Sequence, residues 1–395
     1  MHSTMKIRLL IALISLGIAS IVQAQNRQED TSSVYRSLIP HGKQELLKNV
    51  DIIANMQMGF RSDFLDGNHQ ISKFQIEQFR LEIKGYVHEK VYFRFRHRYT
   101  STFEPQSIDK IIKGVDFAYV RFDISDKLQL TVGKTFADWG GIEFDLNPIM
   151  IYEYSDIIEN ADNFLTGVGL YHQTTKNHGF SFQILNSRTG SFEEIYDTVP
   201  NLVSSKAALA GVINWRGSFW DGKFTTLWSY SLFNEAKGVF KNYLAFGNQL
   251  KLNKVTLAYD YLWSKEDLDR TGIISREVPD DIYNYALENT LYTSHWFKID
   301  YRFKPKWQIS FVGFIDQAKW LDDLDPTKDT DDWRTAYGFI PTLEYFPWDD
   351  INLKFYAGYV GRIYNYSDYA KSRVGVKDYN TGRLIIGIIS PMQVL

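Results

Sequence analysis

The 395-residue sequence contains no cysteine. This absence excludes a disulfide scaffold and a thiolate metal site, and it excludes lipid anchoring through an N-terminal cysteine. Long apolar runs are also missing, because Leu9–Ile21 is the longest and is too short for a comfortable transmembrane helix. It follows Lys6 and Arg8 and precedes small residues that end at Ala24. The pattern predicts a signal peptide over residues 1–24, a polar leader over 25–48 and one domain over 49–395.

Motifs of catalysis are not evident either. The eight histidines show no metal-ligand spacing, and no Gly-x-Ser-x-Gly elbow occurs. A lipase or protease would need a Ser–His or carboxylate–His pair, but His97 and His172 have no evident partner. We therefore predict no enzyme activity, no catalytic residues and no metal centre. A receptor remains the other class, although residues 25–48 are too short for a plug domain.

The chain is rich in aromatic residues yet hydrophilic on average. Phe, Tyr and Trp make up 16% of it, whereas the mean hydropathy is −0.29. This combination is typical of strands with one wet and one lipid-facing side. A soluble periplasmic β-sandwich or solenoid also alternates, so alternation alone leaves both open.

The connections between segments separate these alternatives. From Asn49 onward we count about 16 alternating segments, each near the length that a tilted strand needs to cross a bilayer. Long and short connections alternate between them, with Asp63–Lys73 and Asn234–Lys241 assigned to the long class. A soluble sandwich has no reason to sort its loops in this way, whereas outer-membrane barrels do. The sequence predicts an all-β fold, a transmembrane antiparallel β-barrel of about 16 strands.

The strand at Val91–Thr100 shows which face meets water. Apolar residues alternate there with Arg94, Arg96 and Arg98, whose charges cannot sit unpaired in a dry interior. Residues two apart rise about 6.7 Å, so the three arginines form a ladder along which an anion could pass. The same parity predicts a pore lining of basic residues: Arg80, Lys84, Arg94, Arg96, Arg98, Arg121, Lys298, Arg302 and Lys354.

The third external connection, Phe136–Leu165, combines acids with bulky apolar residues. Its apolar side chains need cover, which the barrel wall offers if the loop folds inward. Such a loop would narrow the pore and set its acids against the arginine wall. These acids are Asp138, Glu143, Asp145, Glu153, Asp156, Glu159 and Asp162.

Three neighbouring segments resemble the phosphate-selective porin O and P family: Asp116–Val120, Asp126–Lys134 and the loop that follows. The resemblance implies a trimeric 16-stranded porin of the bacterial outer membrane, with arginines along the permeation path. Two features depart from the family: the third loop is acidic, and the chain ends in Pro391–Leu395 without a terminal aromatic residue.

The first departure leaves two functions open. One is passive diffusion of small hydrophilic solutes and ions with a preference for anions such as phosphate. The other is general diffusion without phosphate selectivity. The expected partners are outer-membrane lipid, the solutes and two further copies of the chain, with no nucleic acid.

An aspartate-rich external connection, Asp322–Asp332, is the remaining candidate site. Ca²⁺ takes several carboxylate oxygens, so a surface calcium site is one interpretation. The other is a solvated acidic loop, since the spacing matches no known calcium loop. We expect no other cofactor.

Overall fold

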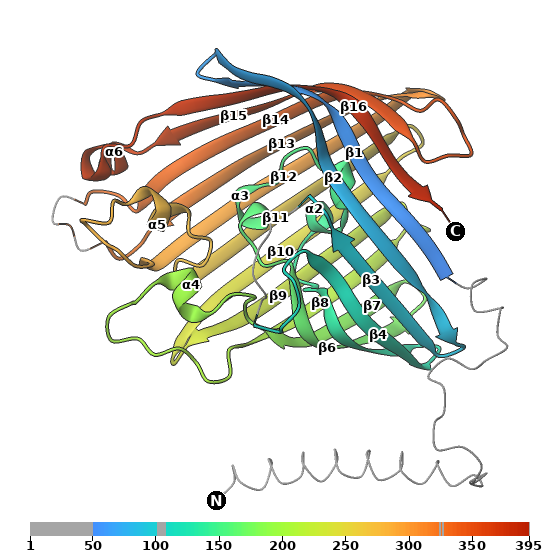
Figure 1. Cartoon of the computed structure of the whole chain (residues 1–395), viewed down its shortest axis with the longest axis horizontal. Coiled ribbons are helices and arrows are strands. Elements are labelled where there is room, and N and C mark those ends of the chain that lie inside the picture. The colour runs from blue at the N-terminus through green and yellow to red at the C-terminus, as the bar shows by residue number, and fades with distance from the viewer. Residues whose placement is uncertain (1–49, 101–107, 324, 326–327, 395) are drawn as a thin grey trace, which may run out of the picture. The chain divides into compact units, whose positions relative to one another are not determined.

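The computed structural model describes residues 50–394 except 101–107, 324, 326 and 327. The predicted signal peptide and leader lie outside the described residues. Sixteen strands form one closed sheet in which each strand pairs with its sequence neighbours and β1 pairs with β16 (Figure 1). The pairs are antiparallel throughout. The predicted barrel is confirmed.

The strands have the following bounds: β1 Val50–Leu65, β2 Asn68–His88, β3 Val91–Arg98, β4 Val115–Ser125, β5 Leu128–Phe136, β6 Phe164–Thr175, β7 His178–Asn186, β8 Leu209–Phe219, β9 Phe224–Ala236, β10 Val239–Lys251, β11 Val255–Leu268, β12 Glu288–Lys304, β13 Trp307–Trp320, β14 Asp332–Tyr345, β15 Lys354–Tyr366 and β16 Tyr379–Gln393.

Two connections that we assigned to the long class are tight turns. β1 and β2 continue to Asp66 and Gly67, which both have positive φ (49° and 76°), as a two-residue hairpin turn requires. Likewise, β9 and β10 are separated only by Lys237 and Gly238. The strands extend beyond the length that a bilayer requires, because hydrogen bonding between neighbours continues outside the hydrocarbon region.

Four of the remaining long connections carry short helices among the described residues. They are α2 (Ile142–Asp145), η3 (Pro148–Met150), α3 (Asp156–Glu159), α4 (Phe192–Tyr196), α5 (Ile273–Glu277) and α6 (Asp368–Val374). Within the described part of the chain, no helix has the length and apolar character needed to cross a membrane.

The two faces of the sheet differ as the alternation predicts. Large apolar side chains such as Phe95, Phe122 and Phe355 are 36–44% exposed on the outside. Their sequence neighbours Arg96 and Lys354 are buried on the inside, at 6% and 4% exposure. A closed sheet with an apolar outer face is the arrangement that a bilayer requires of a β-protein.

Candidate functional site: the lumen and its third loop

The inner faces of β2 and β3 bring five basic side chains together. The strand register pairs Arg80 with Arg98 and Lys84 with Arg94, and it sets Glu82 opposite Arg96. Directly opposed side chains have Cβ atoms about 5 Å apart, so like charges at such positions are destabilising. We name the five basic residues the ladder: Arg80, Lys84, Arg94, Arg96 and Arg98.

Two carboxylates partly compensate the ladder. Glu82 accepts a hydrogen bond from Arg94 (2.9 Å) and lies 3.9 Å from the Lys84 ammonium. Asp116 on β4, which is fully buried, binds Arg96 at 3.0 Å and lies 3.6 Å from Arg80. The Nε and Nη1 atoms of Arg80 are buried without a hydrogen-bond partner among the described residues. Arg80, Lys84, Arg94 and Arg96 thus share these two carboxylates.

An aromatic ring holds the middle of the ladder in place. The Phe117 ring on β4 has the guanidinium groups of both Arg94 and Arg96 over it, each 4.1 Å from the ring centroid. A guanidinium over a ring face is attracted by the ring quadrupole. The ring therefore fixes two arginines that would otherwise repel each other.

The third loop, residues 137–163 between β5 and β6, runs inside the barrel (Figure 1). It is anchored where Asp260 on β11 accepts hydrogen bonds from the backbone N–H groups of Ile142 (2.9 Å) and Glu143 (2.7 Å). Two glycines permit this approach: a Cβ on Gly247 would lie 2.8 Å from the Ile142 nitrogen, and a Cβ on Gly141 would lie 2.5 Å from Asp260 Cγ. Larger side chains would push the loop off the wall.

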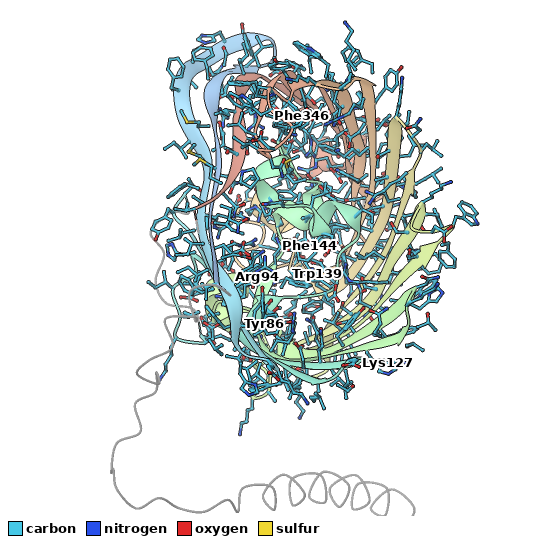
Figure 2. All side chains as sticks on the ribbon, turned by 90° about the vertical axis from the view of Figure 1, so that its right-hand side faces the viewer. Tyr86, Arg94, Lys127, Trp139, Phe144 and Phe346 are labelled. Carbon is cyan, nitrogen blue, oxygen red and sulfur yellow. The ribbon has the colours of Figure 1, made fainter. Side chains whose placement is uncertain are left out.

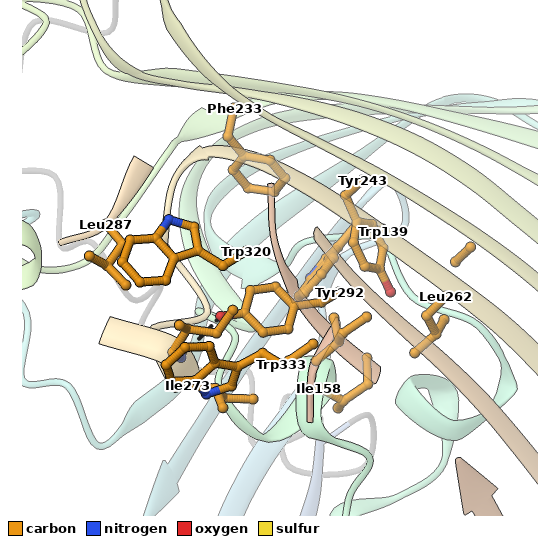
Figure 3. Packing of buried hydrophobic residues seen from close by; sticks show 14 of the residues in the cluster. Trp139, Ile158, Phe233, Tyr243, Leu262, Ile273, Leu287, Tyr292, Trp320 and Trp333 are labelled. Atoms are coloured by element: carbon orange, nitrogen blue, oxygen red, sulfur yellow. Dashed lines mark hydrogen bonds between the residues drawn. The ribbon is translucent and has the colours of Figure 1, made fainter. Parts of the chain in front are cut away.

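The apolar side chains of the loop pack against the wall opposite the ladder. Trp139 is 1% exposed, and its ring centroid lies 4.3 Å from that of Tyr243 on β10 (Figure 3). Ile149 is fully buried in a cluster with residues of β9 and β11–β16. Figure 2 shows Trp139 and Phe144 inside the barrel together with Arg94. The lumen is therefore filled on one side and open on the ladder side.

Most acids of the loop are paired away from the ladder. Arg216 on β8 binds Asp138 at 2.7 Å and Asp145 at 3.0 Å. The remaining pairs are Glu153 with Arg383 on β16, Asp156 with Arg362 on β15 and Arg334 on β14, and Asp162 with Arg270.

Glu143 has no cationic partner among these and is fully buried. Its carboxylate accepts hydrogen bonds from the N–H (2.8 Å) and the hydroxyl (2.6 Å) of Ser155. Burial raises the pKa of Glu143 well above its ordinary value, against the effect of these hydrogen bonds. The expectation that the loop sets all its acids against the ladder is therefore wrong, because arginines elsewhere bind five of them and Ser155 binds this one.

Two cavities lie between the loop and the wall around β1, β2, β3 and β16. The inner cavity, of about 520 Å³, is lined by all five ladder residues and by Glu82, Asp145 and Glu159. The outer cavity, of about 240 Å³, is lined by Glu77, Glu153 and Arg383 among others. The two cavities share Gln78, Tyr154 and Glu159. Along β16, Arg383 of the outer cavity comes nearer the long-loop end and Pro391 of the inner cavity nearer the short-turn end.

Comparison with known proteins agrees with this architecture. The family model for phosphate-selective porin O and P matches residues 50–387. The chain belongs to the phosphate-selective porin O and P family. It is a porin of the bacterial outer membrane. No protein with a curated description matches the sequence.

Solved structures share the fold at low sequence identity. The outer membrane channel DcaP of Acinetobacter baumannii has a TM-score of 0.58 at 10% identity, covering 87% of this chain and 98% of that one. OmpF of Salmonella typhi, in complex with daunomycin, has a TM-score of 0.55 at 13% identity, with 86% and 98% covered. A loop L8 deletion mutant of OmpT from Vibrio cholerae has a TM-score of 0.55 at 9% identity, with the same coverage.

Four predicted basic residues of this porin do not line the ladder cavity. Arg121 binds Asp123 (2.9 Å) and the Tyr86 hydroxyl (2.6 Å) near a short turn. Arg302 donates to the Pro305 carbonyl (3.2 Å) at the end of β12.

Lys298 and Lys354 line a separate cavity of about 210 Å³ behind the loop. There Lys298 pairs with Asp300, and Lys354 pairs with Glu344 at 2.5 Å. The alternation of side chains along each strand correctly places these lysines on the inner face of the barrel. It cannot show on which side of the third loop they lie.

Five arginines that hold the loop are not among the residues predicted from the sequence: Arg216, Arg270, Arg334, Arg362 and Arg383. The excess of acids in the loop was a usable signal, because buried carboxylates need cationic partners. Acids of the candidate calcium loop also have cationic partners. Asp323 accepts a hydrogen bond from Arg373 (3.2 Å), and Asp331 pairs with Lys328 (2.7 Å). Calcium binding by this loop stays a prediction.

Proposed function

We propose that this porin lets small hydrophilic solutes and ions diffuse passively and favours anions, phosphate among them. The observation that carries the proposal is the inner cavity, which five basic and three acidic side chains line. Asp145 is already bound by Arg216, so its charge is compensated from outside the cavity. The ladder therefore keeps an excess of positive charge towards the open side of the lumen.

The arrangement of the ladder supports conduction over tight binding. Like charges oppose each other at Arg80 and Arg98, and at Lys84 and Arg94, at a cost in stability that an incoming anion would relieve. Successive basic groups offer an anion several neighbouring positions, and conduction requires that binding be weak and multiple. A positive field in a narrow lumen raises the local concentration of anions.

General diffusion without phosphate selectivity is the second candidate. Asp145 and Glu159 lie in the same cavity as the ladder, and acids opposite bases give a transverse field that admits small solutes of either sign. The two functions differ in the ratio of anion to cation permeability and in the ratio of phosphate to chloride.

Assembly as a homotrimer is part of the proposal. OmpT of Vibrio cholerae, which has a TM-score of 0.52 to this chain at 10% identity, is described in a trimer form. Cross-linking of the folded protein in detergent would test it, because a trimeric species should appear at low protein concentration.

The charge preference can be tested with a double variant, Lys84→Gln with Arg94→Gln. These two residues pair with Glu82, whereas Arg80 and Arg96 bind Asp116, so the change leaves the buried pairs of Asp116 in place. Reversal potentials in KCl and potassium phosphate gradients should show wild-type anion preference and a several-fold lower anion-to-cation ratio in the variant. The matched control is Arg302→Gln, which removes a cation outside the cavity and should leave the ratio unchanged. An equal ratio in all three proteins would refute the role of the ladder.

A further inference from the structure

Glu159 is the exception among the seven acids of the third loop. Its carboxylate has no hydrogen bond or ion pair with any residue that the structure describes, whereas each of the other six has such a partner. Glu159 ends α3, and its side chain is exposed to the lumen. A carboxylate left without a partner in this position is free to act on passing ions.

The position of Glu159 is as distinctive as its lack of a partner. It lines both the outer and the inner cavity, together with Gln78 and Tyr154. Of these three side chains only Glu159 carries a charge at neutral pH. An ion that moves from the outer cavity to the ladder passes this point.

The charged groups around Glu159 come from the loop and from three parts of the wall. Glu153 and Asp156 lie on the loop itself, Arg362 is on β15 and Arg383 is on β16. Across the inner cavity lie the ladder and Glu82, on β2 and β3, and this cavity also contains Asp145 of the loop. Glu77 on β2 lines the outer cavity. Arg362 and Arg383 are bound by Asp156 and Glu153, respectively.

The protonation state of Glu159 changes near neutral pH. Although its surface opens on the lumen, the protein packed around it removes much of its bulk water and raises its pKa to about 7, with Glu153 and Asp156 acting in the same direction and Arg362 and Arg383 against it. The carboxyl is accordingly neutral below this pH and ionised above it. No histidine lines either cavity, and the arginines keep their charge at all relevant pH values.

We propose that Glu159 is a selectivity-determining residue, whose charge at the junction of the two cavities opposes the ladder and limits its preference for anions. The inference rests on the proposed function, because it requires ions to pass along the ladder. When Glu159 is ionised, it attracts cations to the junction and repels anions from it. When it is neutral, the ladder acts alone and anion preference increases.

The test compares wild type, Glu159→Gln and a control, Glu193→Gln, which removes an exposed carboxylate of α4 outside both cavities. Each purified porin is placed in planar bilayers, and reversal potentials in a KCl gradient are measured at about pH 5.5 and about pH 8.5. In water, a single negative charge about 7 Å from a passing ion raises the local concentration of a monovalent cation about threefold and lowers that of a monovalent anion about threefold. Because the two effects multiply in the ratio, we expect the wild-type chloride-to-potassium ratio to be about ninefold higher at the lower pH.

The variants then separate the possible results. Glu159→Gln should show the high ratio at both pH values, and Glu193→Gln should follow wild type. Glu159→Asp, which restores an ionisable group, should recover the pH dependence. Equal pH dependence in wild type and in Glu159→Gln overturns the role of Glu159 and leaves the proposed function intact. A wild type that conducts but prefers cations at both pH values overturns the proposed function itself.

Discussion

Replacing Asp260 with alanine should release the third loop from the wall of the barrel. The Asp260 carboxylate is fully buried and accepts hydrogen bonds from the N–H groups of Ile142 (2.9 Å) and Glu143 (2.7 Å). A hydrogen bond to such a group contributes about 1.5 kcal/mol. Losing two of them should cost about 3 kcal/mol, which is about a hundredfold shift between the docked and released loop.

Hydrogen exchange followed by mass spectrometry measures this shift directly. The amides of residues 141–146 should exchange about a hundredfold faster in Asp260→Ala than in wild type, while those of the strands should not change. Asp300→Ala is the matched control, because Asp300 on the neighbouring strand β12 pairs with Lys298 and not with the loop. Unchanged exchange over residues 141–146 in a folded Asp260→Ala barrel would refute the anchor.

Two further variants test the packing and charge of the loop. Arg216→Gln leaves Asp138 and Asp145 without their shared cation. Since Asp145 lines the inner cavity, we expect the anion-to-cation ratio from reversal potentials to fall about ninefold; no change would mean that permeating ions do not sense Asp145. Trp139→Ala removes a ring that is 1% exposed, which should cost about 3–5 kcal/mol and lower the midpoint of thermal unfolding followed by circular dichroism. A midpoint equal to that of wild type would show that the Trp139–Tyr243 contact does not stabilise the docked loop.

The barrel could be predicted from the sequence because the alternation that identifies each strand involves only residues close together in the chain. Alternation in a strand such as Val91–Arg98 places Phe95 outside and Arg96 inside, and the structure confirms both. The lengths of the extended β1–β2 and β9–β10 hairpins could not be predicted in the same way. The pair Asp66-Gly67 is a strong turn signal, but the polar residues around it read as a loop because no lipid enforces alternation there.

The site was predictable only in part, because it depends on contacts across the lumen. Parity brings Arg80 and Arg94 to the same inner face, and strand pairing sets them beside Glu82. No local pattern shows that Arg362 binds Asp156, which lies 206 residues earlier in the chain. Pairs of this kind compensate five acids of the third loop, so the sequence-based prediction overstated the negative charge that the loop sets against the ladder.

The far-reaching anchors of the third loop bear on the order of assembly. Arg383 binds Glu153 across 230 residues, and Arg362 binds Asp156 from β15, so these contacts need the last strands of the sheet to be in place. Contacts of such high sequence separation form late, since the chain between them must first be ordered. We therefore expect the loop to dock after the C-terminal strands have paired and β16 has paired with β1 to close the barrel. During biogenesis a wide and leaky precursor would then precede the narrow pore, and a docked loop would be a marker of completed maturation.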